Sequence, residues 1–127
     1  MANIINNPAP KKILFKGIRQ DNGQWVEGIY LDENHIGIFH DDTEEEDCWI
    51  EIFPVVPGTI SEYTGKQDAD RKDIFVGDIV EEGCNGLVGA VVWDNQLGTY
   101  RIEGLGEGYT IAESHISWHI IGNIHKN

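Results

Sequence analysis

The sequence has few cysteines, few basic side chains and no long apolar run, and each shortage excludes a class of protein. Its two cysteines, Cys48 and Cys84, lie outside any CxxC pair and have no histidines at zinc-finger spacing, so neither a zinc site nor a redox motif is indicated. Two cysteines in a chain without a secretory signal are most simply reduced thiols. No apolar run approaches the roughly 18 residues of a membrane-spanning helix, and residues 1–12 lack the apolar segment of a signal peptide. We therefore expect a cytoplasmic protein without a membrane partner.

Basic residues are scarce relative to acidic ones. The chain has 9 Lys and Arg against 22 Asp and Glu, which gives a net charge of −13, and its basic residues are adjacent only at positions 11–12 and 71–72. Binding to DNA or RNA normally requires clustered Lys and Arg that displace counterions from the phosphates. Nucleic acid is therefore disfavoured as a partner. An acidic surface suits solubility, a basic protein partner, or imitation of the nucleic-acid backbone.

The length of 127 residues predicts one domain with a core large enough to fold without metal or disulfides. Residues 1–10 lack any periodicity and are predicted to be a flexible arm. Residues 11–127 are predicted to form a single β domain, which divides into halves at 11–57 and 58–127.

Short apolar runs separated by turn residues fill the rest of the chain. Asn22 and Gly23 lie between the first two runs and predict a hairpin with a type I′ turn, because both residues tolerate a positive φ. No stretch shows the 3.6-residue period of an amphipathic helix, and only one short helical turn is expected, near Glu113 and Ser114. The fold class is therefore all-β: a small barrel of short strands and hairpins with little helix. The predicted strands are residues 13–19, 24–31, 35–40, 48–53, 60–64, 74–82, 87–93, 99–102, 109–112 and 116–124.

The charged loop at residues 68–73 begins like a calcium-binding loop, with carboxylates at alternate positions. A calcium loop then needs a third oxygen ligand, a glycine and a twelfth-position glutamate. Here Lys72, Asp73 and Ile79 occupy those three positions, so calcium binding is excluded. The stretch that begins at Asp32 fails in the same way, and the glycines at 104–108 match neither a P-loop nor a dinucleotide fingerprint.

Three sets of polar residues invite a site hypothesis, and none forms a recognisable catalytic or metal-binding motif. His115 and His119 would share a face on a helix, but in the strand predicted there they lie roughly 13 Å apart, too far to hold one metal ion. A hydrolase could use Glu81, Glu82 or His115, or a nucleophile at Cys84 or Ser114, but no nucleophile motif surrounds them. We therefore predict no catalytic, cofactor or metal site and a protein that is not an enzyme. A weak nucleic-acid surface would need Lys11, Lys12, Lys16 and Arg19.

Two further features of the sequence indicate interaction surfaces rather than catalytic or metal-binding sites. Residues 41–47 contain six carboxylates in seven positions, which predicts a solvated loop or hairpin tip that could attract a basic partner. The tryptophans lie in or at the end of predicted strands, where packing in the core or between subunits is their expected role. They are Trp25, Trp49, Trp93 and Trp118.

Three segments in order resemble the YopX family. They read FKGIRQDNGQWVEGIY at residues 15–30, EYTG at 62–65 followed by DIFVGDIV at 73–80, and IGNIHKN at 121–127. The chain departs from the family pattern at Asp70 and Arg71, where Asn-Gly is usual, and it ends before the family's Pro-Glu-Leu tail. The opening of the second half, GDIV and then VGAVVWD, also looks like an SH3-like barrel.

This resemblance implies a small β-rich protein encoded by bacteriophages or prophages, without an established activity and without catalytic residues to transfer. The leading hypothesis is a non-enzymatic interaction module that self-associates in the bacterial cytoplasm, because many short strands leave edges to be covered. Its partners would be copies of itself, or a host or phage protein. The alternative is an acidic nucleic-acid mimic that inhibits a host nucleic-acid-binding protein. The loop at residues 68–73 is predicted to be a connection, with Gly77 and Asp78 at a bend.

Overall fold

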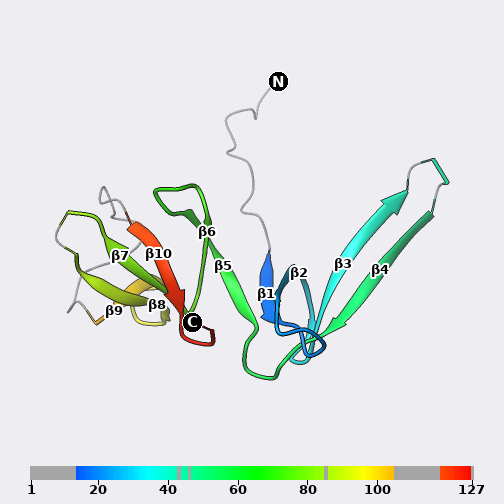
Figure 1. Ribbon diagram of the computed structural model, residues 1–127, viewed down its shortest axis with the longest axis horizontal. Helices are drawn as coiled ribbons and strands as arrows, with labels where there is room; N and C mark the ends of the chain where they lie inside the picture. Colours follow the sequence, from blue (N-terminus) through cyan, green and yellow to red (C-terminus); the bar gives the residue numbers. More distant parts are fainter. Residues whose placement is uncertain (1–13, 43, 46, 85, 105–117, 127) are drawn as a thin grey trace.

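The computed structural model describes residues 14–42, 44–45, 47–84, 86–104 and 118–126, and the strands of these residues form two antiparallel sheets. The six-stranded sheet has the order β4-β3-β2-β1-β5-β6, and the four-stranded sheet has the order β10-β7-β8-β9. The end of the first sheet that bears β3 and β4 and the whole second sheet lie at opposite ends of the molecule (Figure 1). The predicted mainly-β fold class is confirmed. The described strands do not close into a barrel, and the SH3-like form of the second half stays a prediction.

The strands coincide with most of the apolar runs. The first sheet consists of β1 (Phe15–Ile18), β2 (Trp25–Asp32), β3 (His35–Asp42), β4 (Asp47–Pro54), β5 (Ser61–Gln67) and β6 (Asp73–Phe75). The second consists of β7 (Asp78–Glu82), β8 (Val88–Asp94), β9 (Thr99–Glu103) and β10 (Trp118–Asn123). The predicted strand at 109–112 and the predicted helical turn near Glu113 lie outside the described residues, as do residues 1–10.

The first hairpin is confirmed, but the type I′ turn predicted for it is wrong. Gly23 has a φ of +71°, whereas Asn22 has no positive φ. The Gly23 amide donates to the carbonyl of Arg19 at 3.0 Å, and the Arg19 amide donates to the carbonyl of Gln24 at 2.8 Å. The loop is therefore wider than a two-residue turn, and only its glycine needs the left-handed conformation.

Gly77 separates what the sequence predicted as one strand, residues 74–82, into β6 and β7. Its φ of +94° lies in the region that favours glycine, and the chain bends there, as predicted. The bend lets β6 pair with β5 in the first sheet while β7 pairs with β8 and β10 in the second. One short segment thus connects the two sheets.

The buried apolar side chains form two clusters, and the second includes Ile74 from β6 of the first sheet. The first cluster is built on Val26, Ile36 and Val55, and Phe15, Ile38, Phe53 and Ile60 pack against it. The second consists of Ile74, Val80, Val91, Tyr100, Ile102 and Trp118, and Val76 and Ile120 pack against it. Trp118 is thus a core residue, one of the two roles predicted for the tryptophans, whereas Trp49 and Trp93 are 50% and 46% exposed.

A buried ion pair links the two sheets. Lys16 of β1 places its Nζ 3.1 Å from Oδ1 of Asp78 in β7, and the two side chains are 13% and 2% exposed. Asn123 of β10 donates to the same oxygen at 2.9 Å, while the Phe75 amide donates to Oδ2 at 2.8 Å. The ammonium group also lies 4.4 Å from the ring centroid of Trp25 and 4.6 Å from that of Phe75. All three segments that carry the family resemblance meet at this carboxylate.

We expect Asp78→Ala to destabilise the fold by about 3–5 kcal/mol, because it leaves the Lys16 ammonium buried without a counter-charge. Denaturant unfolding at pH 7 measures this change. Asp21→Ala, which removes a carboxylate from the exposed Arg19–Asp21 pair, is the matched control and should change stability far less. Lys16→Met combined with Asp78→Ala should recover part of the loss. Equal effects for Asp78→Ala and Asp21→Ala would show that the link is not structural.

Candidate functional site

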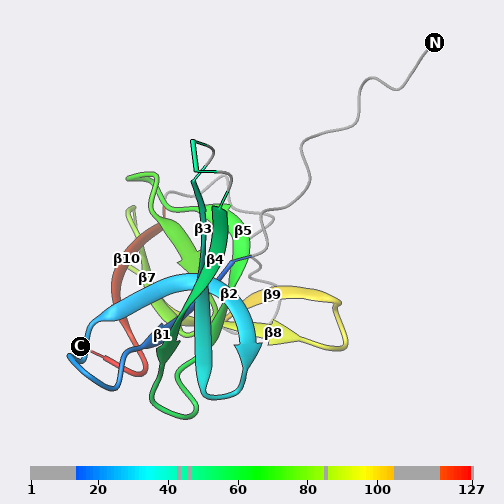
Figure 2. The ribbon, with the colours of Figure 1, turned by 90° about the vertical axis from the view of Figure 1, so that its right-hand side faces the viewer.

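The hairpin of β3 and β4 extends away from the four-stranded sheet (Figure 1). In Figure 2 this hairpin faces the viewer and the four-stranded sheet lies behind it. The two strands pair without interruption from His35 opposite Pro54 to Asp42 opposite Asp47. Beyond them, β2 pairs with β3 only as far as Gly37. The outer half of the hairpin is therefore a two-stranded ribbon in the described part of the chain.

One face of this hairpin is apolar and exposed. Successive side chains of a strand point to opposite faces, which places Phe39 of β3 and Ile50 and Ile52 of β4 on the same side. Phe39 is opposite Ile50, and Ile52 is opposite Gly37, which in turn pairs with Ile29 of β2. Phe39 and Ile52 are 56% and 58% exposed. We call Ile29, Phe39, Ile50 and Ile52 the apolar face.

Hydrogen bonds at the base of the hairpin show which residues of β4 direct their backbone outward. The Val55 amide donates to the Asn34 carbonyl at 2.8 Å. Because pairs in an antiparallel ladder alternate between bonded and non-bonded, Pro54 and every second residue before it turn their backbone groups away from β3. Pro54 has no N–H, and its carbonyl accepts a 3.0 Å hydrogen bond from the Gln20 amide. Gln20 therefore covers the edge at this end.

The remaining outward-facing residues are Cys48, Ile50 and Ile52, which we call the open edge. β4 is an outermost strand of the six-stranded sheet, and the described residues place no further strand beside it. All of its residues except Phe53 are exposed. An exposed apolar edge of this length is a ready template for another strand.

The opposite face of the hairpin mixes aromatic and charged groups. The His40 and Trp49 rings stack with centroids 4.9 Å apart, and Nε2 of His40 lies 2.9 Å from Oε1 of Glu51. Nearer the base, the Arg19 guanidinium lies 4.7 Å from the ring centroid of Phe53. This face therefore alternates carboxylates and aromatic rings along β4, with the Arg19–Asp21 pair beside Phe53.

The acidic run at residues 41–47 lies at the end of the hairpin, as predicted. Asp41, Glu44, Glu45 and Asp47 are exposed, while Thr43 and Glu46 lie outside the described residues. The carboxylates therefore surround the tip of the same element that presents the apolar face.

The charged loop at residues 68–73 is held by a buried carboxylate. Oδ1 of Asp68 accepts hydrogen bonds from the Asp70 amide at 2.8 Å and the Lys72 amide at 2.9 Å. Oδ2 accepts from the Ile120 amide of β10 at 3.1 Å. The loop is therefore a structural connection that also fixes the start of β10.

Asp68 is 7% exposed, and this burial by itself would raise the pKa of its carboxyl group. The hydrogen bonds from the amides of Lys72, Ile120 and Asp70, together with the charge of Lys72, outweigh burial and lower the pKa. Arg71 adopts a φ of +66° in this turn, at the position where Asn-Gly is usual in the resembled family. The turn therefore places the Arg71 side chain in a backbone conformation that favours glycine.

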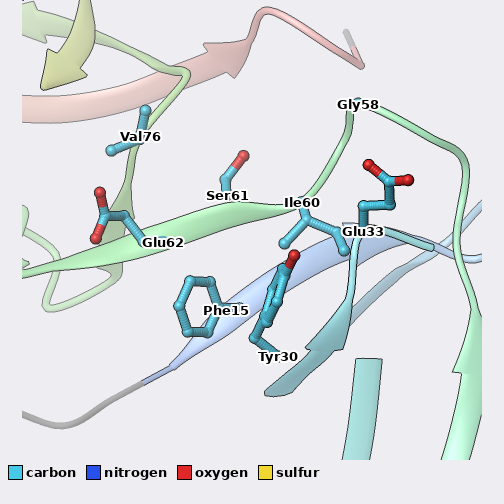
Figure 3. Close-up of a pocket in the computed structure, with 8 residues that line it drawn as sticks. All are labelled: Phe15, Tyr30, Glu33, Gly58, Ile60, Ser61, Glu62 and Val76. Carbon is cyan, nitrogen blue, oxygen red and sulfur yellow. The ribbon is translucent and has the colours of Figure 1, made fainter. Parts of the chain in front are cut away.

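A cavity of about 490 Å³ lies between β1, β2 and β5 (Figure 3). The Phe15 and Tyr30 rings, with centroids 5.5 Å apart, form one wall, and the Glu33 and Glu62 carboxylates lie on either side. The Ser61 hydroxyl donates to the Thr59 carbonyl at 3.3 Å, so no base activates it. The lining residues are Phe15, Tyr30, Glu33, Gly58, Ile60, Ser61, Glu62 and Val76.

The described residues bring together only some of the polar candidates from the sequence: His119 of β10 lies opposite Glu81 of β7, and Glu82 lies beside Cys84. His115 and Ser114 lie outside them, and Nδ1 of His119 lies 3.3 Å from Oδ2 of Asp70. Cys48, in β4, and Cys84, in the turn after β7, are exposed free thiols. Glu82 is buried and accepts from the Cys84 amide, while Glu81 is half-buried beside it.

The basic candidates are also dispersed. Lys11 and Lys12 lie outside the described residues, Lys16 is bound to Asp78, and Arg19 is paired with Asp21 at 2.6 Å.

Within the described ranges, no three His, Cys, Asp or Glu side chains are grouped to hold a metal ion. In the same ranges, no helix has the length and apolar character needed to cross a membrane.

Sequence reasoning missed the open edge, because nothing local marks β4 as an outermost strand. Its alternation of Cys48, Ile50 and Ile52 with Trp49 and Glu51 is typical of any half-buried strand.

In a comparison with known protein families, the model of the family described as YopX protein matches residues 14–127 of this chain. No curated protein is significantly similar to the chain.

We expect Asp68→Asn to destabilise the protein by about 2–4 kcal/mol at pH 7, because an amide group turns a donor toward one of the three backbone N–H groups. The folded pKa of Asp68 lies below its unfolded value near 3.8. Its contribution is therefore full above that value and is lost as pH falls through the folded pKa.

The stability difference between wild type and Asp68→Asn should accordingly shrink below about pH 4. Denaturant unfolding at several pH values measures it, and Asp70→Asn, at the exposed neighbour, is the control. A difference that stays constant down to about pH 2 would contradict the role of the ionised carboxylate.

Proposed function

Since this chain belongs to the YopX family, and membership alone names no activity, we propose that it is a non-enzymatic interaction module that self-associates through the β3–β4 hairpin. We take it to be encoded by a phage or prophage and to act in the bacterial cytoplasm, as the family resemblance suggests. The observation that supports self-association is the apolar face beside the open edge. The hairpin needs a partner because its face is apolar and its outer half has only two strands among the described residues, and a second copy of the chain can be that partner.

The apolar face is unusual for a surface this acidic. Ile29, Phe39, Ile50 and Ile52 are each more than a third exposed and lie next to one another on three strands. Contiguous exposed apolar patches mark interaction sites on soluble proteins. Pairing two open edges would bring Ile50 and Ile52 of one copy beside those of the other and remove part of their apolar area from water, which favours association.

The hairpin also lacks the support that a ribbon of this length needs. Two-stranded ribbons are at best marginally stable in water, and a third strand or a packed face stabilises them. Beyond Gly37, β3 has no second neighbour in the described residues. A strand added to β4 would supply a third strand, through main-chain hydrogen bonds that need no particular partner sequence.

A second copy can supply that strand without any further element. Two identical edges pair antiparallel about a two-fold axis, and such closed symmetric dimers are the commonest oligomers. The pairing joins the apolar faces of both copies into one continuous surface. We therefore expect the protein to be at least a dimer.

Light scattering after size-exclusion chromatography tests this proposal at tens of micromolar. We expect a mass at least twice that of one chain for the wild type. Ile50→Lys should weaken association by about 100-fold or more, because it places like charges together at the edge. Leu97→Lys replaces an apolar residue in the β8–β9 turn that is at least as exposed as Ile50 and should leave the mass unchanged. A monomeric wild type would overturn self-association.

The acidic tip of the hairpin favours a second candidate function, the nucleic-acid mimic. Its carboxylates are exposed, and the hairpin that carries them extends away from the four-stranded sheet (Figure 1), where a basic DNA-binding protein could approach them. Neutralising Asp41, Glu44, Glu45 and Asp47 together should then abolish capture of a host nucleic-acid-binding protein that duplex DNA also displaces. The same charge change at Asp21, Glu33, Glu62 and Glu103 is the control. Capture that survives neutralisation of the tip would contradict mimicry.

A further inference from the structure

We propose that two copies pair their β4 strands antiparallel about a two-fold axis at Ile50, so that Cys48 of one copy lies opposite Ile52 of the other. This inference rests on the proposed self-association and adds its register. The register follows from three separate features of β4: its backbone, its apolar side chains and its charges.

The backbone limits the choice of register. Only Cys48, Ile50 and Ile52 direct an N–H and a C=O outward without a partner in the described residues, since Pro54 lacks the N–H and Gln20 occupies its carbonyl. An axis at Ile50 pairs each of these three residues with another member of the same set. Any axis displaced along the strand pairs at least one of them with Pro54 or with the tip.

The apolar side chains agree with this axis. Ile50 would face its own copy across the axis, and the Cys48 thiol of each copy would face Ile52 of the other; within its own chain Cys48 is opposite Asp41. Phe39 lies opposite Ile50 on the inner side of the hairpin. The two apolar faces would thus meet without a polar residue between them, which cross-strand pairing favours.

The charges on the opposite face discriminate among neighbouring registers. An axis at Glu51 would place two glutamates directly opposite each other, and an axis at Trp49 would place Asp47 opposite Glu51; like charges in such pairs are destabilising. An axis at Ile50 places Glu51 opposite Trp49 and Asp47 opposite Phe53. Neither of these pairs places two carboxylates directly opposite each other, and the Arg19 guanidinium, which is paired with Asp21, lies over the Phe53 ring.

Cysteine cross-linking tests the register, because Cys48 already provides one thiol. In a Cys84→Ser background, Ile52→Cys should give a covalent dimer with diamide or with a short thiol-bridging reagent such as dibromobimane. Bonded pairs in an antiparallel sheet have Cα atoms about 5.5 Å apart, within the range of a disulfide. Within one chain, positions 48 and 52 are about 13 Å apart along the strand, so no internal bridge competes.

We expect Ile52→Cys to cross-link at least about tenfold faster than Ile121→Cys, a similarly exposed position on β10 that reports random collision. Peptide mapping should find Cys48 of one chain joined to the thiol introduced at position 52 of the other. Ile52→Cys combined with Cys48→Ser should not cross-link faster than the collision control.

The outcomes separate the register from the proposed function. A dimer by light scattering that joins two Cys48 thiols, or two thiols at position 52, or forms no specific link, would overturn the register and leave self-association standing. A monomer that shows only collisional cross-linking would overturn both.

Discussion

The arrangement of the two sheets depends on the buried carboxylate of Asp78. It receives the Lys16 ammonium from the first sheet, the Asn123 amide from the last strand and the Phe75 amide from the bend between the sheets. Such a charge is tolerated in the interior only when paired and hydrogen-bonded. The requirement therefore fixes β1, β7 and β10 relative to one another, and with them the direction in which the first sheet extends.

Because the first sheet extends in that direction, the β3–β4 hairpin lies at its far end, away from the second cluster of buried apolar side chains. Residues of β1 and β5 have neighbouring strands on both sides, but β4 pairs with β3 alone among the described strands. Its apolar side chains thus remain exposed although the same alternation would bury one face elsewhere. The strand order of the two sheets therefore explains both why apolar side chains are buried near the second sheet and why those of β4 are exposed at the opposite end.

Local sequence predicted the strands well, because alternation and turn residues act over a few positions. It also predicted the bend at Gly77 and Asp78, where Asp78 accepts a hydrogen bond from the nearby Phe75 amide. It could not predict Lys16 as a partner, which is 62 positions away, or the bond from the Ile120 amide to Asp68, 52 positions away. The exposure of Ile50 and Ile52 likewise depends on strand order, and the type I′ turn failed because Gly23 bonds back to Arg19 across a wider loop.

The remaining edges explain why pairing through β4 would stop at two copies. At the other end of the same sheet, β6 spans only Asp73–Phe75, and short edge strands are a common protection against open-ended stacking. A two-fold pairing uses the open edge of both copies, so neither β4 can pair with a third chain. The net charge of −13 opposes any further approach of chains that lack a complementary surface. The acidic composition and the apolar hairpin are therefore compatible: the first limits association in general, and the second permits it at one edge.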